Sequence, residues 1–246
     1  MSDLGKLDQV DLTRQFKDKD EYKQQLEKWQ LRLLKLEEAL RDKALAVLIA
    51  FEGWDASGKG GAIKRLTAVL DPRGYKVYSI CAPTDEEKAH NYLWRFWNHT
   101  PRQGEMVIFD RSWYGRVLVE RVEGFAKKPE WQRAYEEINC FEEQLRADGT
   151  VTIKFWLHVS PEEQLQRFKE REASLFKRYK IGPDDWRNRE KWGKYLVAAE
   201  AMFKETDTAG CPWHLVSGEH KWWARVEVLK TVVKRMEKML GKDVAD

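Results

Sequence analysis

A glycine-rich segment between an apolar run and a helical pattern constrains the fold of this chain more than any other feature. Residues 51–66 read FEGWDASGKGGAIKRL, and Gly53, Gly58 and Lys59 match the phosphate-binding pattern G-x-x-x-x-G-K-[ST] up to its last position. ALAVLIAF precedes the glycines and AIKRLTAVL follows them, which predicts strand, loop and helix in that order. In a loop between such a strand and helix, successive backbone N–H groups and the helix N-terminus attract an anion. A tight turn with incidental glycines is the alternative, but the strand, spacing and lysine together favour a phosphate loop.

The loop departs from the pattern in two places, and both departures concern a metal ion. Gly60 stands where a Ser or Thr hydroxyl would hold magnesium, and an acid, Asp55, lies inside the loop. An aspartate there would repel phosphate unless a cation lay between them. A second acid, Asp110, ends the apolar run MVIFD, and a hard cation bound to phosphates needs only one or two carboxylates. The sequence therefore predicts a Mg²⁺ site at Asp55 and Asp110, with Mn²⁺ as a substitute. The alternative, Asp55 as a helix cap, is weaker because Ser57 is nearer the helix start.

Five short apolar runs alternate with helical stretches and predict a parallel sheet. They are residues 44–51, 76–80, 106–110, 151–159 and 213–217. Their near-continuous apolar character indicates strands buried on both faces, and the alternation predicts a three-layer α/β/α fold. Ligands of such sheets bind beyond the carboxyl ends of the strands, where the glycine loop and Asp110 both fall.

A basic segment follows the fourth predicted strand. Between Arg167 and Lys194 there are ten Lys or Arg residues against five acids. Ser160 marks a helix start, and Arg167, Arg171 and Arg178 recur at spacings of four and seven, as on one helical face. We interpret the segment as a lid over phosphates in which Arg171 reaches the reaction centre, while Arg111, next to Asp110, aims at the transferring phosphoryl group. The simpler alternative is a solvated helix face.

Amphipathic stripes near both ends predict long helices. Apolar residues recur every three or four positions from Tyr22 to Leu40 and from Trp222 to Leu240. Both stripes could be oligomer seams, but packing on the chain's own core is the favoured interpretation. The predicted organisation is one domain, 1–246. Its parts are an N-terminal helical segment (12–43), a core (44–217) with a lid at about 165–192, and a C-terminal helix (218–241).

Bulk properties exclude several classes of protein. No apolar run approaches the roughly 18 residues that a membrane helix needs, and the polar N-terminus resembles no signal or transit peptide. Three cysteines without C-x-x-C spacing give little support for zinc or a disulfide framework, and they indicate a reducing cytoplasm. The net charge is only +3, so the chain as a whole is not a polycation. We expect neither a membrane nor a nucleic acid as partner.

Several long motifs resemble those of the polyphosphate kinase 2 family: FEGWDASGKGGAIKRLT, LDPRGY, YLWRFW and IFDRSWYGRVLVERVEG, together with the lid arginines. The resemblance implies a phosphate-loop kinase fold, Mg²⁺-dependent phosphoryl transfer between inorganic polyphosphate and a nucleotide, and a homo-oligomer, a dimer or tetramer. The family's loop carries an aspartate before its lysine and a glycine after it. Its active-site set falls here on Asp55, Lys59, Asp110, Arg111 and Arg171.

The resemblance also indicates the substrates. We expect adenine nucleotides, with guanine nucleotides as an option, and reversible conversion of AMP to ADP, of ADP to ATP, or both. Trp54 resembles the monophosphate-using branch, although that branch also includes fused two-domain chains. The predicted phosphate-binding residues are Gly53, Ala56, Ser57, Gly58, Lys59, Gly60, Gly61, Lys64, Arg65 and Arg178.

Two other functions stay open at this point. One is an ATP-dependent nucleoside monophosphate kinase of the thymidylate-kinase type, which polyphosphate supplied without ATP would distinguish. The other is a non-catalytic polyanion-binding module. Sparse aromatics in the basic stretch and the complete pair of acids argue against it.

Overall fold

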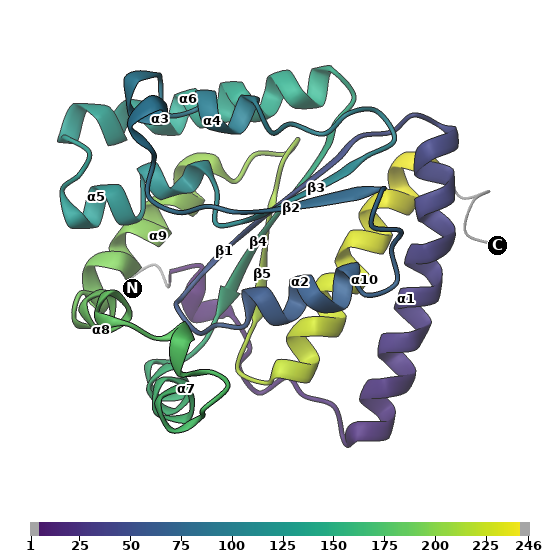
Figure 1. Ribbon diagram of the computed structural model, residues 1–246, viewed down its shortest axis with the longest axis horizontal. Coiled ribbons are helices and arrows are strands. Elements are labelled where there is room, and N and C mark those ends of the chain that lie inside the picture. The colour runs from purple at the N-terminus through teal and green to yellow at the C-terminus, as the bar shows by residue number, and fades with distance from the viewer. Residues whose placement is uncertain (1–4, 242–246) are drawn as a thin grey trace.

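A five-stranded parallel sheet forms the centre of the molecule (Figure 1). The computed structural model describes residues 5–241. The strands are β1 (Val47–Gly53), β2 (Tyr75–Ser79), β3 (Met106–Asp110), β4 (Val151–His158) and β5 (Trp213–Ser217). Their order is β2-β3-β1-β4-β5, so β1 is central, with Phe51 beside Asp110 of β3 and Gly53 beside Leu157 of β4. The predicted three-layer α/β/α class and all five strands are confirmed.

Two details of the strand prediction were wrong. β2 is not buried on both faces: it lies at the sheet edge, where Val77 is 42% exposed and Lys76 pairs with Glu105. The first strand begins at Val47 rather than at residue 44. The reason is the preceding turn, in which Ala44 has a φ of 50° and the Leu45 amide donates to the Leu40 carbonyl. The chain therefore becomes extended only after helix α1 has been terminated.

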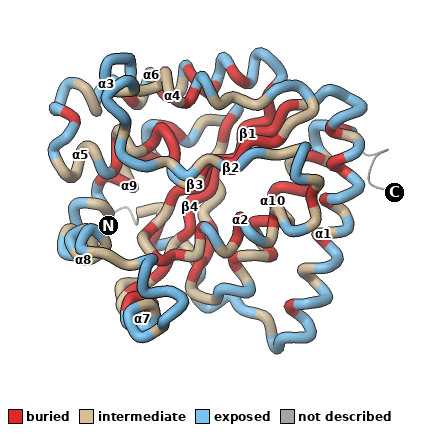
Figure 2. Tube along the Cα trace, in the orientation of Figure 1, coloured by how far each residue is buried: buried red, intermediate tan, exposed pale blue. Residues whose placement is uncertain are grey.

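Helices cover both faces of the sheet (Figures 1 and 2). On one face α2 (Lys59–Thr67) packs against α10 (Lys221–Leu240), which packs in turn against α1 (Lys19–Asp42). Leu33 of α1 and Leu229 of α10 are fully buried in the same cluster as Phe51 and Phe155. The apolar stripes of the terminal helices thus pack on the chain's own core, which is the interpretation that the sequence favoured over oligomer seams.

The other face carries the second half of the core. Helices α5 (Val119–Glu123), α6 (Lys128–Ala147) and α9 (Trp192–Thr206) cover it, and their buried cluster includes Phe109, Trp113 and Phe203. The short elements are η1 (Leu7–Gln9), α3 (Asp85–Ala89), α4 (Trp94–Trp97) and η2 (Trp113–Arg116). No helix within residues 5–241 is long and apolar enough to span a bilayer.

The segment predicted as a lid lies at the carboxyl edge of the sheet (Figure 1). It consists of α7 (Pro161–Ala173), η3 (Arg178–Lys180) and α8 (Pro183–Glu190). Ser160 caps α7 by accepting a hydrogen bond from the Glu163 amide, as predicted. Because α7 ends at Ala173, Arg178 does not share its face with Arg167 and Arg171, and that prediction was wrong. The spacing of seven is interrupted by a turn that the periodicity does not reveal.

Candidate active site

The glycine loop joins β1 to α2 in a conformation that few side chains permit. Gly53 has a φ of 138°, and a Cβ there would lie 2.4 Å from the Leu157 carbonyl oxygen, so only glycine fits between β1 and β4. Gly58 has a φ of 112° and Ala56 a φ of 60°. Around Gly60 there is open space, so its lack of a side chain leaves room at the first turn of α2. In that turn the Gly61 N–H donates to the Gly58 carbonyl (2.9 Å), whereas the N–H groups of Lys59 and Gly60 donate to no residue in the described part of the chain and are available to an anion.

Lys59 is buried within this loop. Its side chain is 9% exposed, and Nζ donates to the carbonyl oxygens of Gly53 (2.8 Å) and Trp54 (3.0 Å). Burial lowers its pKa, while the carboxylates of Asp55, Asp110 and Glu52 oppose that shift. The ammonium group is therefore held by neutral acceptors and surrounded by carboxylates that do not contact it directly.

One aspartate lies within the loop, and a second ends the strand next to β1. Asp55 accepts hydrogen bonds from Arg111 Nη2 at Oδ1 (3.0 Å) and from Asn188 Nδ2 at Oδ2 (2.8 Å). Asp110 ends β3 beside β1, and its carboxylate accepts no hydrogen bond from any residue in the 5–241 range. Each oxygen of Asp55 keeps a free lone pair, and both oxygens of Asp110 are open.

This pair fits a divalent cation whose other ligands come from outside the protein. No group of three or more His, Cys, Asp or Glu side chains arranged to hold a metal occurs in the described part of the chain. Mg²⁺ typically uses one or two carboxylates together with water and substrate phosphates. Asp55 and Asp110 therefore suit a cation that binds with a phosphate ligand.

Arg111 has a strained backbone that Glu52 supports. Its φ is 67°, a left-handed conformation that costs a non-glycine residue about 1–3 kcal/mol. The next residue, Ser112, donates from its N–H (2.7 Å) and its hydroxyl (2.8 Å) to Glu52 Oε1. Burial lowers the pKa of Arg111, but the carboxylates of Asp55, Glu52 and others outweigh it, so that the pKa is raised. Sequence reasoning missed Glu52, although an acid at the end of an apolar strand was a visible signal.

Arg171 and Arg178 differ in their relation to the loop. Arg171 is half-buried and donates to the Lys180 carbonyl (3.2 Å), and burial lowers its pKa while Asp185 and Asp55 raise it. Arg171 is thus an electrostatic neighbour of the loop. Arg178 is exposed in η3, and no residue of the described chain forms a hydrogen bond or ion pair with its side chain. Lys64 and Arg65 lie along α2 and have no carboxylate partner in that same range.

Trp54 lies in the core. Its side chain is 5% exposed, stacks on Trp192 of α9 with ring centroids 3.7 Å apart, and donates to His158 Nδ1 (2.9 Å). The Trp54 indole therefore joins the loop to α9 rather than facing a ligand.

Four polar residues beside the loop were not predicted as site residues. Asn188 of α8 contacts Asp55, and Gln164 and Arg167 of α7 contact loop carbonyls. Arg225 of α10 lies beside Gly61, where a built Cβ would be 3.7 Å from its Nε. All four come from elements far along the chain, so only the fold reveals their proximity.

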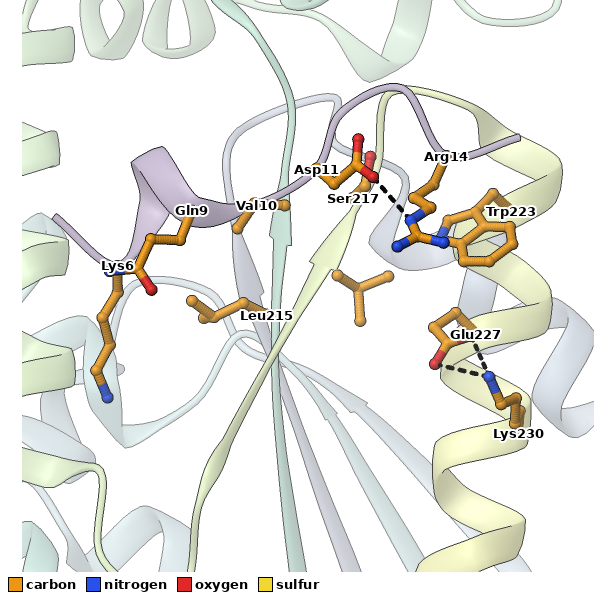
Figure 3. A pocket seen from close by; sticks show the side chains of 11 residues that line it. Lys6, Gln9, Val10, Asp11, Arg14, Leu215, Ser217, Trp223, Glu227 and Lys230 are labelled. Carbon is orange, nitrogen blue, oxygen red and sulfur yellow. Dashed lines mark hydrogen bonds and ion pairs between the residues drawn. The ribbon is translucent and has the colours of Figure 1, made fainter. Parts of the chain in front are cut away.

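A separate cavity of about 550 Å³ lies along β5 (Figure 3). Its cations have partners: Arg14 pairs with Asp11 and Lys230 with Glu227. It shares no residue with the glycine loop, so it is not part of the candidate site.

Comparison with known proteins places the chain in a family. Residues 16–243 match Polyphosphate kinase 2 (PPK2). The chain is 51% identical over 243 residues to a polyphosphate:AMP phosphotransferase of Pseudomonas aeruginosa, covering 99% of this chain and 49% of that protein. A GDP-polyphosphate phosphotransferase of the same organism is 38% identical over 212 residues, with coverages of 86% and 59%.

A solved structure agrees with this similarity. Polyphosphate kinase 2 from Arthrobacter aurescens TC1 superposes with a TM-score of 0.90 at 33% identity, over 94% of this chain and 85% of that one. The chain spans about half the length of the AMP phosphotransferase that it matches. It belongs to the polyphosphate kinase 2 family.

Proposed function

We propose that this protein transfers a phosphoryl group between inorganic polyphosphate and an adenine nucleotide, with AMP as the acceptor. The observation that carries the proposal is the convergence of Lys59, Asp55, Asp110 and Arg111 at the carboxyl edge of the sheet. Phosphoryl transfer needs positioned cations around a linear array of phosphates rather than a covalent catalyst. The activities named for the relatives support the same chemistry.

The choice of AMP rests on the relatives and not on Trp54. Identity to the AMP phosphotransferase is 51%, against 38% to the GDP enzyme. Because Trp54 is buried against Trp192, its side chain does not contact an acceptor in this arrangement. ADP and guanine nucleotides are the further acceptors to be tested, and the reaction is reversible in this proposal.

The proposed mechanism assigns a task to each predicted residue. Loop amides between Ala56 and Gly61 hold the donor phosphates in line with the acceptor oxygen, so that positioning supplies much of the acceleration. Lys59, Arg111 and Arg171 neutralise the charge that spreads over the transferred group. Asp55 and Asp110 would hold Mg²⁺, for which Mn²⁺ would substitute, and Asp110 also orients the attacking oxygen. When bound, the cation would neutralise phosphate charge.

The remaining basic residues form the proposed donor path. Polyphosphate is a chain of negative charges, and Lys64, Arg65 and Arg178 are cations without carboxylate partners among the described residues. The rest of the predicted phosphate-binding set, Gly53, Ser57, Gly58, Gly60 and Gly61, belongs to the loop, where the open space at Gly60 gives phosphates close access to the backbone. We further propose one domain with a lid at about 165–192, a cytoplasmic location, and a homo-oligomer whose mass light scattering would measure.

The test is product formation from AMP with long-chain polyphosphate and Mg²⁺ and without ATP. Rapid ADP formation is expected. Product formation only from ADP would refute AMP as the acceptor. Activity only when ATP is supplied would refute polyphosphate as the donor. Binding of polyphosphate without any transfer would indicate a non-catalytic module.

A variant pair assigns the activity to the site. Asp110→Asn should abolish transfer with the fold intact, whereas Asp148→Asn, an exposed residue remote from the loop, should not change it. Activity of Asp110→Asn within about tenfold of the native enzyme would contradict the role of Asp110.

A further inference from the structure

Three consecutive carbonyl groups of the phosphate loop accept hydrogen bonds from helix α7. Gln164 Nε2 donates to the Asp55 carbonyl (3.1 Å), and Arg167 Nη1 donates to the carbonyls of Ala56 (2.9 Å) and Ser57 (3.0 Å). Both side chains are buried, with exposures of 2% and 3%. The loop is therefore held from outside by two buried side chains.

Arg167 uses its whole guanidinium group in this way. Nη2 donates to the carbonyls of Gly218 (2.6 Å) and Glu219 (3.0 Å), and Nε donates to Glu163. Glu219 in turn accepts from the Ser160 amide and hydroxyl at the start of α7. One side chain thus joins α7, the phosphate loop and the turn between β5 and α10, and none of its donors is left for a ligand.

These bonds determine where the loop N–H groups point. In a planar trans peptide the N–H of one residue is antiparallel to the C=O of the residue before it. Drawing the Asp55 and Ser57 carbonyls toward α7 therefore directs the Ala56 and Gly58 N–H groups to the opposite side. The Ser57 N–H donates to the Trp54 carbonyl and closes the turn. Ala56, with its φ of 60°, is strained and needs external support to stay in this conformation.

We propose that Gln164 and Arg167 are positioning residues that preorganise the phosphate loop for the donor. This rests on the proposed function, since it specifies how the same loop holds its phosphates. Arg167 also places a buried positive charge near the anion site, with Nη1 3.8 Å from where a Cβ of Gly58 would be. Arg171 lies one turn further along α7, so the helix that shapes the loop also presents that arginine.

Two variants and two matched controls test the proposal. Arg167→Lys keeps the charge but lacks the fork that spans several carbonyls, and Gln164→Met removes one donor at nearly constant volume. Gln166→Met and Lys169→Met make equivalent changes at exposed positions of the same helix. For each protein, calorimetry gives the affinity for tripolyphosphate, steady-state kinetics gives kcat and both KM values, and thermal unfolding gives Tm.

The expected result is a loss of transfer without a loss of acceptor binding. Arg167→Lys should lower kcat by about 100-fold and should also lower the affinity for tripolyphosphate. Small displacements of a preorganised group have effects of that size on the rate. Gln164→Met should lower kcat by about tenfold, and the KM for AMP should not change. Both controls should match the native protein, which separates local positioning from general charge on α7.

Three outcomes would overturn the proposal. One is a folded Arg167→Lys, or a folded Gln164→Met if the lysine variant does not fold, with kcat and tripolyphosphate affinity within about twofold of native. Another is an equal loss in Lys169→Met. The third is a loss confined to Tm. A native protein that binds tripolyphosphate but transfers nothing would refute the proposed function, and the binding data alone would then decide the positioning role.

Discussion

Two lysines are buried within residues 5–241, and their surroundings are opposite in kind. Lys154 of β4 is fully buried, and Nζ donates to Glu142 Oε2, Tyr114 Oη and the Thr206 carbonyl, each at 2.8 Å. Lys59 of the loop is 9% exposed, and among the described residues its Nζ donates hydrogen bonds only to the carbonyls of Gly53 and Trp54. One charge is neutralised by a carboxylate in direct contact and the other is not.

Under the proposed function, the difference separates a structural charge from a catalytic one. Glu142 also accepts from Trp113 Nε1 (3.1 Å) and from Tyr114 Oη (2.7 Å), so the Lys154 network is complete without a ligand. A buried charge held only by neutral groups carries an uncompensated desolvation cost, which an anionic ligand can offset. Lys59 is a buried charge of this kind. Asp110 is the corresponding acid, because its carboxylate accepts no hydrogen bond among the described residues.

The largest expected effect is on catalysis, from Lys59→Met. Transfer should fall by about 10⁴-fold, comparable to the loss of a charge that stabilises the transferring group. Tm should stay the same or rise, because burial lowers the Lys59 pKa and the charged side chain is therefore unfavourable in the empty loop. Kinetics and thermal unfolding check both parts. A strong fall in Tm would contradict the functional assignment of this charge.

Lys154→Met should show the reverse pattern, with an effect on folding. Removing the lysine leaves Glu142 buried without a cation, which typically costs about 3–5 kcal/mol of unfolding free energy. The protein that remains folded should keep its kcat. Urea unfolding measures the loss, and the double change Lys154→Met with Glu142→Gln should recover part of it. A lower kcat at full occupancy of the folded state would mean that this network also serves the site.

Glu52 gives a pH-dependent version of the same contrast. Unlike Glu142, its carboxyl group accepts hydrogen bonds, within residues 5–241, only from the neutral donors of Ser112, and burial raises its pKa from an ordinary 4.5 to about 7. Between these values the folded protein keeps a proton that the unfolded chain releases. Its contribution to stability is therefore present below about pH 4.5 and is lost as pH rises to 7, by up to about 3 kcal/mol.

Glu52→Gln removes this titration while keeping a side-chain oxygen for Ser112. Relative to the native protein, the variant should gain stability on going from pH 5 to pH 8. Urea unfolding at the two pH values gives the comparison. An identical difference at both would show that Glu52 does not titrate in this window.

The smallest effect distinguishes two cations on α10. Arg225 lies beside Gly61 and has no carboxylate within 4 Å among the described residues, whereas Lys230 pairs with Glu227 at 2.9 Å. Arg225→Met should raise the KM for polyphosphate several-fold, which corresponds to a loss of about 1 kcal/mol of binding free energy. Lys230→Met, the matched control, should leave that KM unchanged. Equal KM values for both variants would place Arg225 outside the donor path.

The central part of the site was predictable because it is local in sequence. The strand, glycine loop and helix around Lys59 are contiguous, and Asp110 with Arg111 follows a strand whose apolar run is unmistakable. The long motifs also indicated the family, which the comparisons show. The pairing of β1 with β3 then brings their ends together, and that strand order came from the structure.

The rest depends on contacts that no periodicity encodes. Gln164 and Arg167 reach the loop only because α7 crosses its outer side, and in the sequence Arg167 was grouped with the substrate-facing arginines. The turn that ends α7 at Ala173 interrupted the predicted face with Arg178. The Lys154 network joins β4, α6 and α9. Its lysine lies within the run 151–159, which was predicted as an apolar strand.

The central position of β1 has a consequence for the order in which the chain is made. Its neighbours β3 and β4 come later in the sequence, and Arg167, which holds the loop, later still. A nascent chain that ends before residue 106 carries the complete glycine motif beside no strand partner. One that ends before residue 167 lacks the side chain that orients the Ala56 and Ser57 carbonyls. The recognisable motif is thus synthesised early, whereas its strand partners and Arg167 come late, so an unfinished or truncated product would carry the signature without the contacts that hold it in place.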